Sequence, residues 1–242
     1  MIVSINQPAY LPWLGYFHRI NISDVFVFFD STQFEKNSMV NRNKIKTSQG
    51  PVMLTVPVKL KDHFKKIIKD IEIAEPKCLE RHWKSIELNY KKTKFWNDYS
   101  EKLKKIYKKE YNNISDLCYD QLILFLEILD IKTKIVKFSD LNDINSKKEQ
   151  LVIEICKDLG ARTYVSGSLG REYITNDHFK KSDIGLYYQN YNHPEYYQSW
   201  GAFIPYMSII DLLFNEGPNS LSIIMKNNVT KEELLTNKDL YE

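Results

Sequence analysis

The first thirty residues contain two short apolar runs, one over residues 2–5 and one between Asp24 and Asp30. Such runs are typical of strands that are buried on both faces, as in a parallel sheet covered by helices. Residues 7–20 lie between the runs and carry two prolines followed by a helix-compatible stretch. The opening of the chain therefore predicts a strand, a loop, a helix and a second strand, which together form a βαβ unit.

The chain then departs from this pattern in two places. Alternating residues on either side of the turn-forming residues 48–50 predict a β-hairpin over about 40–58. A helical period predicts three helices within about 76–131. We interpret both segments as additions to the sheet.

The second half returns to strands separated by helices. We expect strands at 133–138, 163–166 and 184–189. Ser146, with Glu149 three residues later, predicts a capped helix that ends before Gly160. A last helix is expected over about 207–214, before Gly217 and Pro218.

These elements predict one α/β domain over residues 1–242, with a Rossmann-like, mainly parallel sheet covered on both faces. The hairpin and the helical segment are insertions into it. Ligands of such sheets bind where the strands end, at their carboxyl edge. Polar residues that directly follow a predicted strand are therefore the first candidates for a site.

Composition excludes several classes of protein. With 43% hydrophobic and 27% charged residues the chain is globular, and it has no apolar run long enough to span a membrane. The first residues lack the features of a signal peptide, so we expect a cytoplasmic protein without a membrane partner. Cys78, Cys118 and Cys156 are isolated, which argues against a disulfide framework and a zinc site, and no other metal site is predicted.

The net charge is +3, and many lysines cluster within residues 59–109. Most of them recur at helical spacing between apolar residues, which is typical of a solvated helix face. Nucleic-acid binding is the alternative, and it would depend steeply on salt. We predict no nucleic-acid partner.

The segment after the first strand, residues 7–17, carries the most information. Its prolines fix a loop, Gln7, Tyr10 and Trp13 project from it, and Gly15 allows a close approach of the backbone where the helix begins. This geometry can receive a phosphate or a carboxylate. The alternative is an aromatic plug that packs the first helix on the sheet.

Two further clusters follow predicted strands. After the second strand come polar residues that can face the same crevice, and Arg42 among them offers the planar fork that suits a phosphate; the cluster comprises Asp30, Gln33, Lys36, Asn41 and Arg42. After the strand at 163–166, glycines mixed with hydroxyls can bind an anion, with Ser166, Gly167 and Arg171 as the candidates. Strand capping and a plain turn are the respective alternatives.

A polar and aromatic segment, residues 188–198, contains His193, Tyr196 and Gln198. An imidazole with a pKa near 6.5 could remove a proton from an amine, so His193 is a candidate base, and His82 and Asp30 are further catalytic candidates. A buried structural histidine is the alternative for both histidines. The signatures of serine hydrolases, zinc hydrolases and P-loop kinases are absent from the sequence.

Taken together, these segments resemble the WbqC-like protein family over nearly the whole chain. The matching stretches are 7–17, 24–34, 41–43, 166–167, 193–198 and 208–215. The family occurs in bacterial gene clusters for O-antigen and other surface polysaccharides. The resemblance therefore implies work on nucleotide-activated sugars or on the groups attached to them.

The first 34 residues are also similar in layout to pantothenate synthetases and other HIGH-motif nucleotidyltransferases, which implies a HUP-like fold. Leu11, Gly15 and the pair at 33–34 match that layout. Pro12 and Tyr16 replace the two histidines that neutralise charge on the transferred phosphate in those enzymes. The likeness therefore supports the fold and not adenylyl transfer.

The two resemblances together suggest a transferase that places an acyl or aminoacyl group on the amine of a nucleotide-linked amino sugar. In this hypothesis Gln7, Tyr10, Trp13 and Gln33 hold the sugar or the acyl donor. Arg42 and Arg171 hold the phosphates, and His193 or His82 removes the proton. The alternative is a nucleotide- or sugar-binding protein without catalysis. The sequence indicates no particular cofactor or oligomeric state.

Overall fold

The computed structural model describes residues 1–61, 63–141, 144, 146–172, 174–237 and 241. Its main sheet has five strands in the order β5-β2-β1-β6-β7, and all four neighbouring pairs are parallel. The strands are β1 (Ile2–Asn6), β2 (Val25–Phe28), β5 (Lys134–Lys137), β6 (Thr163–Ser166) and β7 (Gly185–Tyr188). The prediction of a Rossmann-like parallel sheet is confirmed, whereas kinship with HUP proteins stays a prediction.

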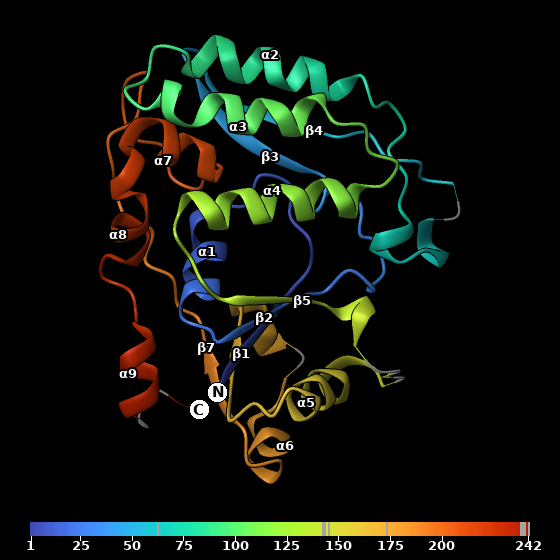
Figure 1. The fold of residues 1–242 in the computed structure, drawn as a ribbon. Coiled ribbons are helices and arrows are strands. Elements are labelled where there is room, and N and C mark those ends of the chain that lie inside the picture. Colours follow the sequence, from blue (N-terminus) through green and yellow to red (C-terminus); the bar gives the residue numbers. More distant parts are fainter. Residues whose placement is uncertain (62, 142–143, 145, 173, 238–240, 242) are drawn as a thin grey trace.

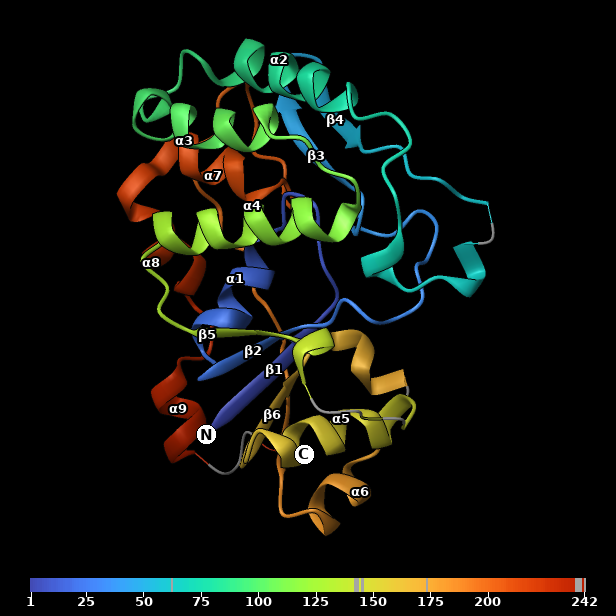
Figure 2. The ribbon, with the colours of Figure 1, turned by 45° about the vertical axis from the view of Figure 1, so that its right-hand side comes forward.

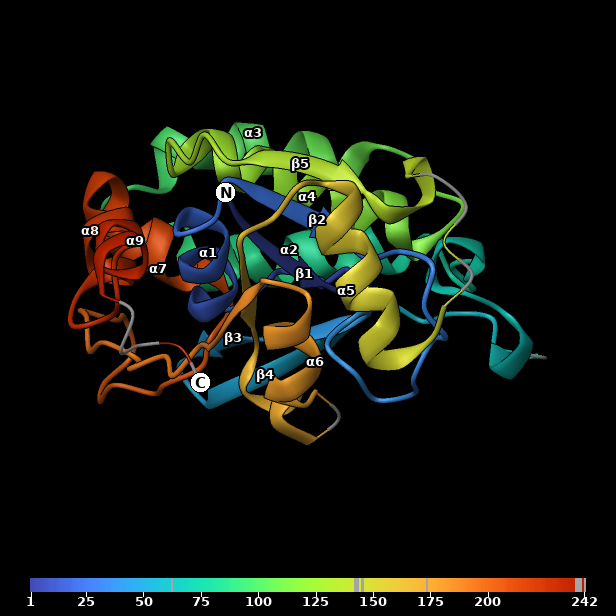
Figure 3. The same ribbon diagram turned by 90° about the horizontal axis from the view of Figure 1, so that it is seen from below.

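The apolar runs are explained by burial on both faces of the sheet. In β2, Val25 and Val27 pack on one side while Phe26 and Phe28 pack on the other. Helices α5 (Lys148–Asp158) and α6 (Asn176–Lys181) cover the valine side. Helix α1 (Leu14–Asn21) covers the phenylalanine side, so that β1 and β2 lie between α1 and α5 when the molecule is seen from below (Figure 3).

The two insertions between β2 and β5 lie together on the α1 side of the sheet (Figures 1 and 2). The hairpin consists of β3 (Arg42–Thr47) and β4 (Gly50–Thr55). The inserted helices are α2 (Cys78–Tyr90), α3 (Trp96–Lys108) and α4 (Ile114–Ile128). Both predictions are confirmed, and the inserted helices share one large apolar core with α1.

After β7 the chain runs from residue 189 to residue 208 without a helix or strand, and we call this segment the strap. Buried polar groups hold it in place. The Tyr196 hydroxyl donates to Asp211 at 2.9 Å, and Lys46 Nζ donates to the carbonyl of Ala202 at 2.5 Å. The chain then forms α7 (Ile209–Glu216), α8 (Ser220–Met225) and α9 (Lys231–Thr236).

Some local predictions were wrong. Helix α5 begins at Lys148 with Lys147 as its N-cap, so Ser146 does not cap it. The Glu149 carboxylate instead accepts hydrogen bonds from the backbone and hydroxyl of Thr175, which lies far away in the sequence. The chain also continues past Gly217 into α8 and α9, because Pro218 stands in a short 3-10 turn that leads into α8. In the described residues, no helix combines the length and apolarity that crossing a membrane requires.

Candidate functional site

The sheet has a reversal of strand order between β1 and β6. From β1 the chain proceeds outward to β2 and β5, and it then returns to the other side of β1 with β6 and β7. Loops that leave the carboxyl ends of the two central strands diverge at such a point and open a crevice. A cavity of about 880 Å³ lies there, lined by Asn6 at the end of β1, by Gln7 after it and by residues 167–170 after β6.

Two cations and one acid lie among the described residues of the cavity wall: Arg19, Lys148 and Glu35. Arg19 lies in the last turn of α1 and is only 5% exposed. Its guanidinium lies against the loop after β6, since a Cβ at Gly167 would be 2.5 Å from Arg19 Nη1. Gly167 is thus required for this close approach, and the wall carries a fixed positive charge that suits an anion.

Three aromatic side chains form another part of the wall, and we call Trp13, Tyr191 and Tyr206 the aromatic shelf. The Trp13 ring lies 5.4 Å from Tyr191 and 6.0 Å from Tyr206, centre to centre. Gly15 makes room for it, because a Cβ at residue 15 would lie 2.2 Å from the Trp13 ring. Tyr206 remains 52% exposed, so the shelf can contact a ligand.

A buried hydrogen-bond chain lies beside the shelf. Gln189 Nε2 donates to the carbonyl of Gly15 and to His18 Nδ1, both at 2.8 Å. His18 Nε2 donates to the carbonyl of Val229 at 2.9 Å. Burial lowers the pKa of His18 to about 4, so this imidazole is neutral at pH 7 and can accept at Nδ1.

The loop after β1 is held in a strained form. Leu11 has φ of +46°, a value that a branched side chain rarely adopts. Its amide donates to Gln121 Oε1 at 3.0 Å, and its carbonyl accepts from Asn43 Nδ2 at 2.6 Å. These clamps come from α4 and β3, so the inserted elements fix the loop that carries Gln7 and Trp13 to the cavity.

The structure brings some of the predicted binding residues together. Gln7, Trp13 and Gly167 line the cavity, and Gly15 lies beneath the Trp13 ring. Gln7 is positioned by a 3.0 Å hydrogen bond from its Nε2 to the Thr32 hydroxyl. The other predicted binding residues are not among the described lining residues: Tyr10, Gln33, Lys36, Asn41, Arg42, Ser166, Arg171, Tyr196 and Gln198.

Several of these outlying residues have structural partners instead. The Tyr10 hydroxyl lies within the inserted helices, 2.7 Å from His82 Nδ1 and 2.9 Å from the Tyr107 hydroxyl. Arg42 donates to the side chain and the carbonyl of Asn37. Arg171 lies over the Tyr188 ring, with its guanidinium carbon 4.3 Å from the ring centre.

The three catalytic candidates also lie outside the described lining. His193 Nδ1 donates to the carbonyl of Pro194 at 3.0 Å, and Nε2 accepts from the Tyr206 amide at 3.2 Å, so both ring nitrogens are engaged. His82 is buried with Tyr10, which lowers its pKa to about 4. The Asp30 carboxylate accepts from the Ser139 hydroxyl and amide at 2.8 and 3.1 Å.

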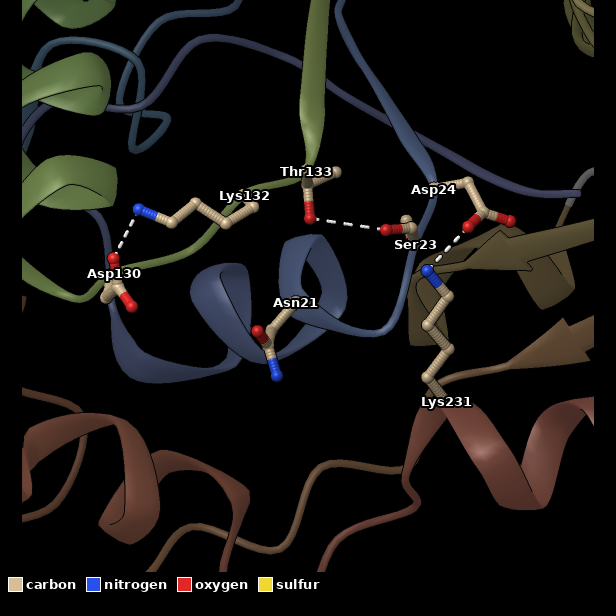
Figure 4. A pocket seen from close by; sticks show the side chains of 7 residues that line it. All are labelled: Asn21, Ser23, Asp24, Asp130, Lys132, Thr133 and Lys231. Carbon is tan, nitrogen blue, oxygen red and sulfur yellow. Dashed lines mark hydrogen bonds and ion pairs between the residues drawn. The ribbon is translucent and has the colours of Figure 1, made fainter.

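A smaller hollow of about 360 Å³ lies at the opposite edge of the sheet, where β2 and β5 begin (Figure 4). Its two lysines are already paired, Lys231 with Asp24 and Lys132 with Asp130. The hollow therefore offers no unbalanced charge to a ligand. Among the residues that the structure describes, no cluster of three metal-ligating side chains was found there or elsewhere.

Sequence reasoning missed several lining residues: Arg19, Lys148, Gln189, Tyr191 and Tyr206. A signal existed for two of them. Arg19 is a cation within a mostly apolar helix, and Gln189 is a polar residue at the end of the strand predicted at 184–189. The sequence did not indicate Tyr206, because its place in the cavity wall depends on the path of the strap, which has no regular secondary structure.

Comparisons with known proteins found a family model and a relative that match most of the chain. A model described as the WbqC-like protein family matches residues 7–223. A protein of Mycobacterium tuberculosis named "Uncharacterized protein Rv1507c" is 36% identical over 217 residues, which cover 89% of this chain and 94% of that protein. No solved structure matches the chain.

Proposed function

The chain belongs to the WbqC-like protein family, and from this premise we propose that it binds a nucleotide-linked sugar in the cavity between β1 and β6, as a step in making a bacterial surface polysaccharide. The observation that carries the proposal is the pairing of a buried cation, Arg19, with an aromatic shelf in one cavity. The cavity volume of about 880 Å³ suits a ligand of this size.

Each part of such a ligand has a matching part of the wall. Arg19 and Lys148 would hold the diphosphate, which carries the negative charge. The shelf would hold the base or the sugar ring, since aromatic faces stack on flat apolar surfaces. The supported partner is thus a small molecule, and neither a nucleic acid nor a membrane is part of the proposal.

A second candidate function is transfer of an acyl or aminoacyl group to the sugar amine. The observation in its favour is Glu35, a carboxylate in the cavity wall that could accept the proton of the amine. His193 is the competing base. If Glu35 acts, Glu35→Gln lowers turnover by about 10²–10⁴-fold while His193→Ala does not, and the reverse result favours His193.

The binding proposal is tested by calorimetric titration with a panel of nucleotide-linked sugars that differ in base and sugar. We expect Lys148→Ala to weaken binding a few-fold and Arg19→Lys to weaken it about tenfold or more, because a charge-assisted hydrogen bond contributes about 1.5–3 kcal/mol. Lys147→Ala is the matched control, as Lys147 is an exposed neighbour that does not line the cavity. A panel in which nothing binds the wild-type protein would refute the proposal.

A further inference from the structure

The side-chain amide of Gln189 has only one orientation that fits its surroundings. The Gly15 carbonyl can only accept a hydrogen bond, so the amide atom that lies 2.8 Å from it must be the NH₂ group. The same group faces His18 Nδ1, and the Val229 carbonyl fixes the proton of that imidazole on Nε2. Both protons of the Gln189 amide are therefore used within the protein.

This arrangement leaves the amide oxygen of Gln189 for the cavity. Gln189 lines the cavity although it is only 5% exposed, and within the described residues no hydrogen bond reaches its Oε1. Oε1 does not belong to the buried side-chain atoms that lack a partner, so it is open to the cavity. A ligand in the cavity can therefore donate a hydrogen bond to this oxygen.

The aromatic shelf lies beside His18, the imidazole that the Gln189 amide contacts. Tyr191 packs against both Trp13 and His18, with ring centres 5.4 and 5.2 Å apart. Tyr191 is itself fixed, since its hydroxyl donates to the carbonyl of Ile224 at 3.1 Å. Gln189 and the shelf line the same cavity, so a ligand ring that contacts the shelf can reach Gln189.

We infer that Gln189 is a specificity-determining residue, whose Oε1 accepts a hydrogen bond from an N–H group on the ligand ring that stacks on the shelf. A hydroxyl can turn to donate or accept, so a fixed acceptor distinguishes it poorly. The ring imide N–H of a pyrimidine base only donates, and so does the amine of an amino sugar in its protonated form. The inference deepens the proposed function and rests on it.

The experiment compares one uridine-diphosphate amino sugar with two analogues by calorimetric titration. The first analogue carries a methyl group on the imide nitrogen of the base, and the second has hydrogen in place of the sugar amine. We expect the wild-type protein to bind one of the two analogues at least about tenfold more weakly than the parent compound, because Oε1 then stays unpaired. The analogue that loses affinity identifies whether the base or the sugar stacks on the shelf.

Gln189→Met provides the control, since methionine has a similar shape without the amide. It should bind the parent and the analogue with nearly equal affinity, whereas a steric effect of the methyl group would persist. If Gln189→Met does not fold, a third analogue serves instead, in which a C–H group replaces the N–H group without added bulk. The wild-type protein should bind it about as weakly as the analogue that loses affinity. Thermal unfolding checks that each variant is folded.

The outcomes separate this inference from the proposed function. If the wild-type protein binds all three compounds equally, or if Gln189→Met keeps the full discrimination, the inference is wrong while the binding proposal stands. Wild-type binding of the C–H analogue with the affinity of the parent compound would also overturn it. If no compound of the wider panel binds, the proposed function fails and the inference fails with it.

Discussion

Gly15 determines where the Trp13 ring can lie. The ring lies over the first turn of α1 at a distance that excludes any side chain at residue 15, with three ring atoms within 2.7 Å of the position of a Cβ. The ring in turn forms the centre of the aromatic shelf. The absence of a Cβ at Gly15 thus allows the Trp13 ring to form one wall of the cavity.

We expect Gly15→Ala to displace the Trp13 ring and to lower the free energy of unfolding by about 1–3 kcal/mol, the usual cost of overpacking. Urea unfolding measures the stability, and near-UV circular dichroism reports the packing of the ring. Gly160→Ala is the control for the spectrum, because a Cβ there meets nothing within 4 Å, whereas its φ of +69° lowers the stability through backbone strain alone. A Gly15→Ala spectrum identical to the wild-type spectrum would contradict this role of Gly15.

At the scale of elements, α4 supports the site from a distance because its Gln121 clamps Leu11. The start of α4 is set by Asn113, whose Oδ1 accepts from the Asp116 amide at 2.8 Å. This is the usual N-cap bond, and it satisfies one of the free amides of the first turn.

We therefore expect Asn113→Ala to lower the free energy of unfolding by about 1 kcal/mol. The adjacent Asn112→Ala is a matched control, because Asn112 is exposed and contributes only its backbone carbonyl, to Ile73. Chemical denaturation of both variants measures the difference. Equal stabilities of the two variants would show that the cap contributes nothing.

Strands were predictable from the sequence where burial on both faces makes them apolar throughout, as in residues 25–29. The N-cap of α5 was not predictable, because Glu149 accepts a hydrogen bond from Thr175. Local sequence spacing does not reveal such a distant contact. Gln7 was predictable as a site residue because it follows a strand directly. Arg19 gave a weaker signal, since an arginine in a helix is usually exposed.

The stability of the whole molecule depends on pH, and two buried histidines, His18 and His82, contribute to this dependence. Burial lowers the pKa of His18 and of His82 to about 4, whereas an unfolded histidine titrates near 6.5. Below pH 6.5 the unfolded chain therefore binds protons that the folded chain does not bind. The free energy of unfolding must fall as the pH decreases toward 4.

Between pH 7 and 5.5 we expect these two histidines to lower the free energy of unfolding by about 2 kcal/mol. Asp211 opposes the trend, because burial raises the pKa of its carboxyl and protonation then favours the folded state. Urea titrations at several pH values measure the slope, and His82→Gln should reduce it by roughly the share of one histidine. The same slope in the variant and the wild type would refute the assignment.

The position of β1 at the centre of the sheet has a consequence for synthesis of the chain. Ile2 pairs with Thr163, so one edge of β1 has no hydrogen-bonding partner until the ribosome has synthesised β6. The β1–β2 pairing can form early on the other edge, together with α1. A nascent chain thus carries an open apolar strand edge through most of its translation, and fragments that end before residue 163 are expected to aggregate.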